Sequence, residues 1–507
     1  MSIRPTRLFS LIILLAPLLV QAEITLAPIF ADHAVLQRDK PLPVWGRGVP
    51  KEKLTVTFQN QTVRTTVDSD GRWIVYFEPL ETSAEGTDLV VVAGKETRVI
   101  KDLVVGEVWL AVGQSNMEWP ISHVRDEERE AAMVDLPLLR HLKIAQTVAG
   151  SPAETVTTSG WQKAAPETVG SFTAVGYFFA RELQRKLDVP LGIINCSWGG
   201  TPIEAWMSEV ALRSTSLAAT VEERWRQALA DWPPERVAAN PAEVAAFLEA
   251  EAHAKATKTR NPLPWPPLPA TPDSRLRPSG LFNAMIAPLQ PAALRGVVWY
   301  QGERNVEQAS DYGELFKAMI GSWRANWGDE TWPFLFVQLP NYAHGNPGGR
   351  EWARLREAQA KALELPGTSM AVTIDLGDPN DIHPTNKMEV GRRLALAAQW
   401  RVYGIPGDYS GPIFASATPE GATMRVRFHH ASPGLVAHHR PVQSLEIAGP
   451  DKVFHVGTGR FDRDTLLISS PAVKQPVAVR YAWSNAPAAN LYDGAGLPAA
   501  PFRSDDW

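Results

Sequence analysis

The chain has 507 residues, which exceeds the roughly 100 to 200 residues of a usual domain, so we expect two or three domains. Hydrophobic residues make up 45% of the chain and charged residues 21%, a globular composition that excludes disordered, collagen-like and coiled-coil proteins. The formal net charge is -5 without a basic block. We therefore expect neither nucleic acid nor an anionic membrane as a partner.

Residues 1–22 have the pattern of a signal peptide. Two arginines precede an apolar run over residues 8–20, and residues 20–22 offer small or apolar cleavage positions. Pro17 interrupts this run, which is shorter than the ~20 residues that a membrane-spanning helix needs. We expect a mature protein that is exported, to a bacterial periplasm or as a secreted protein. Cys196 is the only cysteine, which fits a periplasm better than a disulfide-rich secretome.

Three domains are expected after the signal peptide. Residues 23–103 alternate apolar and polar side chains and predict a β-sandwich-like domain. Residues 104–408 alternate short apolar runs with helical patterns, which is typical of an α/β fold with a parallel sheet covered by helices on both faces. The apolar runs are residues 108–112, 191–194, 296–300, 334–337 and 370–374. Residues 409–507 alternate again and predict a C-terminal β-rich domain.

An insertion over about residues 210–279 breaks the α/β rhythm. It begins with an amphipathic, charged helical stretch around residues 222–229. Five prolines follow between residues 262 and 269, and proline neither continues a helix nor fits a central strand. We expect this proline-rich part to lie extended on the surface, close to the active cleft.

The turn after the strand over residues 108–112 is the first candidate for chemistry. Gly113 lets the backbone bend sharply, so that Ser115 is exposed at a strand-to-helix turn, as a nucleophile requires. The alternative is that Ser115 or Asn116 caps the following helix.

Three further polar blocks follow predicted strands, where open α/β sheets collect their functional loops. The block at residues 195–201 contains Gly199 and Gly200, whose N–H groups are suited to an oxyanion. The block at residues 299–305 carries side-chain amides that can donate to developing negative charge. The block at residues 375–384 ends in one histidine preceded by several carboxylates, which suits a general base.

These blocks read Gly-Gln-Ser-Asn-Met at residues 113–117, Tyr-Gln-Gly-Glu at residues 300–303 and Asp-Ile-His-Pro-Thr-Asn-Lys at residues 381–387. Through them the chain resembles the GDSL/SGNH hydrolase superfamily and, more closely, the sialate O-acetylesterase family of carbohydrate acetylesterases. The resemblance covers almost the whole mature chain. It implies a three-layer, flavodoxin-like parallel sheet with β-rich accessory domains, and chemistry that needs no metal or organic cofactor.

The resemblance also implies roles for individual residues. Ser115 is the nucleophile and lends its own N–H to the oxyanion hole, Gly199 or Gly200 adds a second N–H, and His383 is the general base. Gln301 stands where the superfamily often has an asparagine donor. The remaining polar side chains of these blocks are expected to bind substrate, and they are Gln114, Asn116, Glu303 and Asn305.

The acid of the triad is a departure from the superfamily, whose members commonly place it three residues before the histidine. That position is Asn380 here. We favour Asp381 and then Asp378, because a loop can bring either carboxylate beside Nδ1 of His383, and a Ser-His dyad is the third option.

The expected reaction is hydrolysis of acetyl esters on sugar hydroxyls through an acyl-enzyme. The substrate is O-acetylated sialic acid or an acetylated plant glycan such as xylan or xyloglucan. A sialate would need a cation such as Arg304 for its carboxylate. One alternative is a non-catalytic carbohydrate-binding protein, because the chain has 18 tryptophans. Another is a metal site, which would use His429, His430, His438 and His439.

Overall fold

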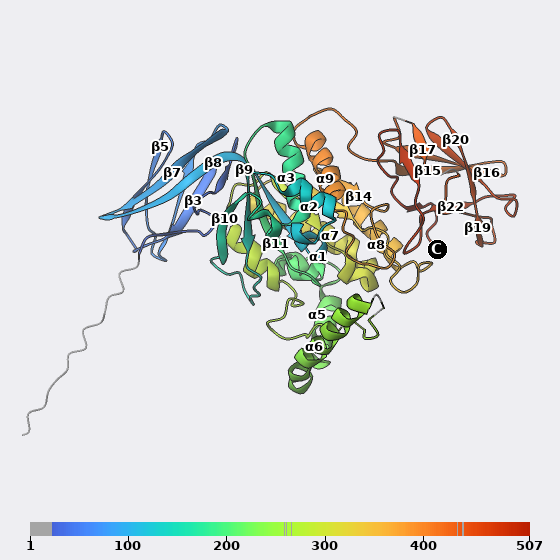
Figure 1. The fold of residues 1–507 in the computed structure, drawn as a ribbon, viewed down its shortest axis with the longest axis horizontal. Helices are drawn as coiled ribbons and strands as arrows, with labels where there is room; N and C mark the ends of the chain where they lie inside the picture. The colour runs from blue at the N-terminus through green and yellow to red at the C-terminus, as the bar shows by residue number, and fades with distance from the viewer. Residues whose placement is uncertain (1–22, 258, 260, 265, 433, 439–440) are drawn as a thin grey trace, which may run out of the picture.

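The computed structural model describes residues 23–507 apart from residues 258, 260, 265, 433, 439 and 440. The expected signal peptide and His439 lie outside the described residues. Figure 1 shows β-rich parts at both ends of the long axis and an α/β part between them. Within the residues that are described, no helix is long and apolar enough to cross a membrane.

The N-terminal part consists of two sheets, β1-β3-β6 and a second sheet in which β4 pairs with β5 and β7. Apolar side chains face inward between the two sheets, where the rings of Phe58 and Phe77 are 6.4 Å apart. The strands are β1 (Thr25–Leu26), β2 (Val35–Gln37), β3 (Leu42–Arg47), β4 (Lys53–Phe58), β5 (Gln61–Thr66), β6 (Arg72–Phe77), β7 (Ser83–Ala93) and β8 (Glu96–Gly113).

Strand β8 connects the N-terminal and central parts. Its first half pairs with β7, and its second half pairs in parallel with β11 and β12 of the central sheet. The boundary that we expect between residues 103 and 104 therefore lies inside one continuous strand.

The central sheet has the strand order β10-β9-β11-β8-β12-β13-β14, and β10 alone in this row is antiparallel to its neighbour. The strands after β8 are β9 (Leu136–Ile144), β10 (Thr158–Ala164), β11 (Leu191–Ser197), β12 (Gly296–Tyr300), β13 (Phe334–Gln338) and β14 (Thr368–Val372). Every residue of β11 to β14 is buried, as strands covered on both faces require. The mixed α/β architecture expected from the sequence is confirmed.

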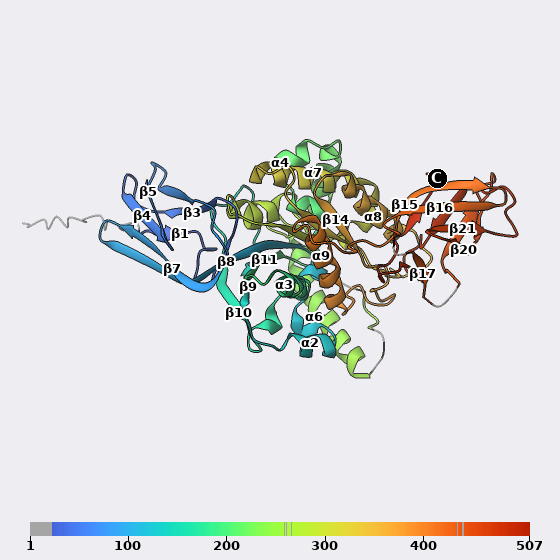
Figure 2. The ribbon, with the colours of Figure 1, turned by 90° about the horizontal axis from the view of Figure 1, so that it is seen from above.

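Figure 2 shows α3 and α9 on one side of this sheet and α7 and α8 on the other. The α-helices are α1 (Ser115–Glu118), α2 (Asp126–Ala132), α3 (Ala174–Leu187), α4 (Glu209–Arg213), α5 (Ala218–Ala230), α6 (Pro234–Thr257), α7 (Ala309–Trp327), α8 (Glu351–Ala360) and α9 (Lys387–Arg401). Shorter helical turns are η1 (Ile121–His123), η2 (Val169–Ser171), η3 (Ile203–Trp206), η4 (Phe282–Ile286), η5 (Ala287–Leu289), η6 (Glu303–Gln308) and η7 (Lys361–Glu364).

The insertion forms a lobe below the central part in Figure 1, where α5 and α6 lie together. Helix α5 includes the stretch expected to be helical, and α6 continues the helical character over 24 residues despite Pro241. The described residues of the proline-rich stretch, between residues 262 and 269, form neither helix nor strand.

The C-terminal part contains two four-stranded sheets, β15-β16-β21-β20 and β19-β18-β22-β24, and the pair β17-β23. Its strands are β15 (Ile413–Glu420), β16 (Thr423–His429), β17 (Leu435–Ala437), β18 (Leu445–Ala448), β19 (Phe454–Val456), β20 (Thr458–Asp462), β21 (Thr465–Ser469), β22 (Ala478–Tyr481), β23 (Leu491–Asp493) and β24 (Phe502–Arg503). A separate buried cluster of apolar side chains fills this part.

Candidate active site

The four polar blocks meet at the carboxyl end of the central sheet. Strand β8 lies between β11 and β12, and Gly113 is paired with Ser197 on one side and with Tyr300 on the other. The loop between β14 and α9 reaches the same place, because Asn116 Nδ2 donates to the carbonyl of Ile382 at 3.0 Å. The sheet topology thus brings together segments that are up to 270 residues apart in the chain.

The turn at Gly113 requires glycine. Its φ is +151°, and a Cβ atom there would lie 2.0 Å from the carbonyl oxygen of Tyr300. The chain therefore passes tightly against β12 before α1 begins at Ser115. Such a turn presents the first side chain of the helix at the edge of the sheet.

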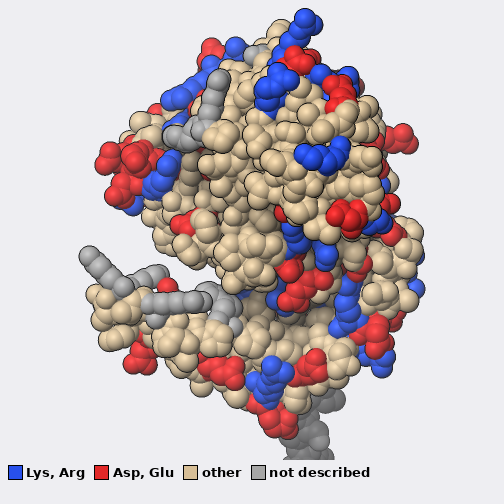
Figure 3. All heavy atoms as spheres, turned by 90° about the vertical axis from the view of Figure 1, so that its right-hand side faces the viewer, with Lys and Arg blue, Asp and Glu red and all other residues tan. Residues whose placement is uncertain are grey.

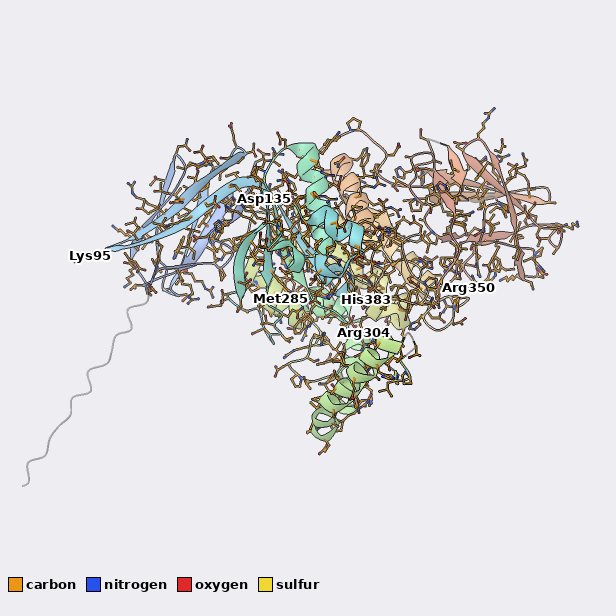
Figure 4. All side chains as sticks on the ribbon, in the orientation of Figure 1. Lys95, Asp135, Met285, Arg304, Arg350 and His383 are labelled. Atoms are coloured by element: carbon orange, nitrogen blue, oxygen red, sulfur yellow. The ribbon has the colours of Figure 1, made fainter. Side chains whose placement is uncertain are left out.

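Ser115 and His383 are in direct contact, with 2.8 Å between Oγ and Nε2. When the hydroxyl donates to Nε2, the neutral imidazole carries its proton on Nδ1. Figure 4 shows His383 in the lower half of the central part, above the lobe of α5 and α6. This pair has the separation that a nucleophile and its general base need.

His383 lies in a half-buried setting that keeps it neutral. The indole of Trp119 stacks on the imidazole with ring centroids 4.9 Å apart. Burial lowers the pKa of His383, the nearby cation of Lys387 lowers it too and the carboxylate of Asp381 opposes both effects, which together bring the pKa to about 4. The imidazole is therefore unprotonated at neutral pH and able to accept a proton.

The two candidates for the acid, Asp381 and Asp378, both lie on the exposed loop that precedes His383. Asp381 Oδ1 accepts the backbone N–H of His383 at 2.8 Å, and Asp378 Oδ1 accepts the backbone N–H of Asn380 at 2.8 Å. Within the described part of the chain, no side chain accepts a hydrogen bond from Nδ1 of His383. Asp381 thus contacts the histidine backbone and influences the ring through its charge.

Two backbone N–H groups are available beside Ser115. Within the described residues, the N–H groups of Ser115 and Gly200 have no hydrogen-bond acceptor in the protein. The N–H of Gly199 is occupied, because it donates to Glu118 Oε2 at 2.8 Å. A Cβ atom on Gly199 would lie 3.2 Å from Cβ of Ser115, so this turn passes close to the serine. Of the two glycines expected to donate, Gly200 has the free group.

The amide of Gln301, expected to donate to an oxyanion, makes its hydrogen bonds within the protein. Its side chain is fully buried, and both hydrogens of Nε2 are used, toward the carbonyl of Thr201 at 3.1 Å and toward Asn305 Oδ1 at 2.8 Å. Its Oε1 accepts the hydroxyl of Tyr312 at 2.9 Å. In this structure the amide holds two loops together, and a role toward an oxyanion stays a prediction.

Three of the four side chains expected to bind substrate are also buried: Gln114, Asn116 and Asn305. Oε1 of Gln114 accepts the N–H groups of Gly302 and Arg304, both at 3.3 Å. Asn305 Nδ2 donates to Glu204 Oε2 at 2.9 Å. The amides of Asn116 and Asn305 and Oε1 of Gln114 thus connect the loops of the site to one another, and a contact of these three residues with substrate stays a prediction.

Asn116 is the centre of a buried polar cluster beneath Ser115. Its Nδ2 donates to Glu303 Oε1 at 2.6 Å, and its Oδ1 accepts from Nζ of Lys387. Burial lowers the pKa of Lys387 to about 7 and raises the pKa of Glu303. Glu303, expected to bind substrate, contacts Asn116 through Oε1, while Oε2 has no hydrogen-bond partner among the described residues.

Lys387, Trp119 and Glu118 are the neighbours of the Ser-His pair that sequence reasoning did not assign. Lys387 closes the motif at residues 381–387, so a signal for it was present. Trp119 and Glu118 directly follow the motif at residues 113–117, but nothing in the sequence indicates which way they point.

The histidines of the C-terminal part lie elsewhere. His430 packs against Tyr409, and His438 packs against Tyr492. Among the residues that the structure describes, no three His, Cys, Asp or Glu side chains are grouped to hold a metal ion.

Comparison with known proteins supports an esterase. The family model described as a carbohydrate esterase, sialic acid-specific acetylesterase, matches residues 105–239 and 273–399, about half of the chain. A solved carbohydrate acetylesterase from Xanthomonas citri is 38% identical with a TM-score of 0.81, over 96% of this chain and 100% of its own. The sialate O-acetylesterases of Mus musculus and Homo sapiens are 29% and 27% identical, over 93% of this chain and 92% and 90% of theirs. This chain therefore belongs to the carbohydrate esterase family of sialic acid-specific acetylesterases and is an acetylesterase.

Proposed function

We propose that the protein hydrolyses acetyl esters on carbohydrate hydroxyls with Ser115 as the nucleophile and His383 as the general base. The observation that carries the proposal is the 2.8 Å contact between Ser115 Oγ and His383 Nε2. It lies beyond the carboxyl ends of the strands, where α/β sheets bind their ligands. The core around it is then the three-layer sheet of SGNH hydrolases.

The reaction proceeds in two acyl-transfer steps. Ser115 Oγ attacks the acetyl carbonyl while its proton passes to Nε2 of His383, and the N–H groups of Ser115 and Gly200 stabilise the oxyanion. The imidazolium then protonates the sugar oxygen as it leaves. In the second step water attacks the acetyl-enzyme while His383 takes its proton, and the imidazolium returns this proton to Ser115 Oγ as the ester bond breaks and acetate leaves. Asp381 stabilises the imidazolium through its charge.

The substrate class is O-acetylated sialic acid or an acetylated plant polysaccharide such as xylan or xyloglucan. We also propose that the signal peptide over residues 1–22 is removed and that the enzyme acts in the periplasm or outside the cell. Fractionation of cells that express the full chain tests this location, and retention of uncleaved protein in the cytoplasm would contradict it.

Acetate release tests the reaction. The protein starting at residue 23 is assayed on O-acetylated sialic acid and on acetylated xylan and xyloglucan oligosaccharides, beside Ser115→Ala and the matched control Ser122→Ala on an exposed turn. Ser115→Ala should lose on the order of 10⁴ to 10⁶ in kcat, while the control keeps wild-type activity. Activity that persists in Ser115→Ala would exclude it as the nucleophile.

A further inference from the structure

A cavity of about 340 Å³ lies between the insertion and the segment that follows β12. Helix α5 contributes Arg224 and Trp225 to its wall, and η6 contributes Glu303, Arg304 and Glu307. Figure 3 shows the surface hollowed between the body of the molecule and the lower lobe. The volume lies within the range of roughly 300 to 1,000 Å³ that is typical of small-molecule sites.

This cavity adjoins the proposed nucleophile. Glu303 in its wall contacts Asn116, and the N–H of Arg304 donates to Gln114, so the wall is bonded to both neighbours of Ser115. Pro202, also in the wall, follows the free N–H of Gly200 by two residues. When the acetyl ester of a sugar lies at Ser115, a neighbouring sugar unit attached to it can therefore reach the cavity.

The lining suits a sugar ring. Trp225 is partly exposed and offers a flat apolar face, with Leu276 and Pro278 nearby. Carboxylates and guanidinium groups around it can accept and donate hydrogen bonds to hydroxyls. Arg224 is neutralised by Asp311 at 2.8 Å. Among the residues described, the exposed guanidinium of Arg304 has no acidic or carbonyl partner.

The charges of the lining favour a neutral ligand. Glu204, Glu303 and Glu307 line the cavity, and Arg304 is the cation there without a partner among the described residues. An anionic sugar would be held near three acidic side chains, whereas a neutral pyranose can use both acids and arginine as hydrogen-bond partners.

We propose that this cavity is a subsite for a neutral pyranose ring adjacent to the acetylated sugar, with Trp225 stacking on the ring. The proposal rests on the esterase function proposed above and adds to it that the enzyme recognises an oligosaccharide beyond the acetylated unit. The insertion thereby contributes to substrate selection through α5.

Substitution of Trp225 tests the subsite. In Trp225→Ala, the kcat/KM for a neutral acetylated oligosaccharide, divided by that for p-nitrophenyl acetate, should fall about tenfold, because the small ester does not reach the indole. The matched control is Trp232→Ala in the same insertion, whose indole packs against Arg236 outside the cavity. An unchanged ratio in Trp225→Ala, or an equal fall in the control, would overturn the proposal.

Binding to Ser115→Ala separates this proposal from the proposed reaction. Calorimetry with the deacetylated neutral oligosaccharide should show binding that weakens about tenfold when Trp225→Ala is added, whichever residue is the nucleophile. Free sialic acid should bind more weakly than the neutral oligosaccharide. Tighter binding of sialic acid, reduced by Arg304→Gln, would replace the neutral-ring assignment with an acidic-sugar site. Acetate release from Ser115→Ala would contradict the proposed reaction alone.

Discussion

Burial and two nearby side chains of opposite charge set the pKa of His383 and with it the pH at which the proposed base should work. Burial lowers its pKa most, Lys387 lowers it too and Asp381 raises it, and the result is about 4. We expect kcat/KM to rise as the pH is raised through this value and to be level above it. Asp381→Asn removes the charge that raises the pKa, so the acid limb of the profile should move to lower pH. Lys387→Met should move it to higher pH.

Profiles of kcat/KM against pH from 3 to 8 check these shifts. Asp378→Asn is the matched control, because this exposed carboxylate contacts the backbone of Asn380 instead of that of His383. A larger shift in Asp378→Asn than in Asp381→Asn would transfer the role of the acid to Asp378.

Gln301 should contribute more to stability than to catalysis. Gln301→Ala leaves the buried carbonyl of Thr201 without a donor and removes one of the two donors to Oδ1 of Asn305, which keeps the N–H of Ile203. This should lower the free energy of unfolding by about 2 kcal/mol. Urea unfolding measures this, with Gln308→Ala as the partly exposed control from the same segment. A kcat loss of 10² to 10³ without loss of stability would restore Gln301 as an oxyanion donor.

The sequence predicts which residues lie together at the site. It does not predict whether their side chains point toward a ligand or toward other parts of the protein. Ser115 and His383 could be paired in advance because each follows a strand of one parallel sheet. The burial of Gln114, Gln301 and Asn305 could not, because polar side chains beside a nucleophile look the same whether they bind a ligand or bind one another.

Among the elements, α9 depends on a carboxylate from α2. Glu128 is fully buried, its Oε2 accepts the N–H groups of Lys387 and Met388 at the start of α9, and its Oε1 accepts from Arg125. A negative charge at this end of a helix is stabilising. The loop that ends in His383 therefore runs into a helix whose first turn is fixed to another element.

Removal of this contact should destabilise the protein and loosen the histidine loop. We expect Glu128→Ala to lower the free energy of unfolding by about 2 to 3 kcal/mol, because the N–H of Met388 and the guanidinium of Arg125 lose their acceptor and the N–H of Lys387 keeps only the carbonyl of Thr385. Glu127→Ala, at the exposed neighbouring position, is the control. Equal midpoints of urea unfolding in the two variants would show that Glu128 does not anchor α9.

Strand prediction succeeded where burial was complete. Strands β11 to β14 are short, and every residue in them is buried. The short apolar runs in the sequence therefore predicted them. Strands β9 and β10 were not predicted, because they lie toward the edge of the sheet and are only partly buried. A half-exposed strand next to an antiparallel edge lacks the continuous apolar run of a central strand.

At the scale of the whole molecule, the C-terminal part braces the loop that carries His383. The segment over residues 341–352 lies between the two. Asn341 Oδ1 accepts the N–H of Gly377 at 3.0 Å, and the N–H of Ala343 donates to the carbonyl of Pro379 at 3.0 Å. Arg350 of the same segment, labelled in Figure 4, pairs with Glu446 of the C-terminal part at 2.9 Å. These contacts join residues far apart in the chain, so no local sequence pattern predicts them.

Asn485 connects the C-terminal part to the segment over residues 341–352 through three side-chain hydrogen bonds. Its fully buried side chain accepts the N–H of Trp352 at 2.9 Å and donates to the carbonyl of Asn346 at 3.0 Å and to Glu351 Oε2 at 2.8 Å. Asn485→Ala removes these three hydrogen bonds and leaves the N–H of Trp352 without an acceptor, while the carbonyl of Asn346 keeps the N–H of Gly349. It should lower the free energy of unfolding by about 2 to 3 kcal/mol.

Asn485→Ala should also slow catalysis. It frees the segment over residues 341–352, and this segment is hydrogen-bonded to the loop that carries His383. We expect a fall in kcat of about tenfold at a temperature where the variant is still folded, since His383 is the proposed general base and small displacements of such a group are costly. Lys474→Ala, at an exposed position of the C-terminal part, is the control and should change neither quantity. A destabilised Asn485→Ala enzyme with full kcat would show that the C-terminal part supports folding without positioning His383, and the bracing role would then be wrong.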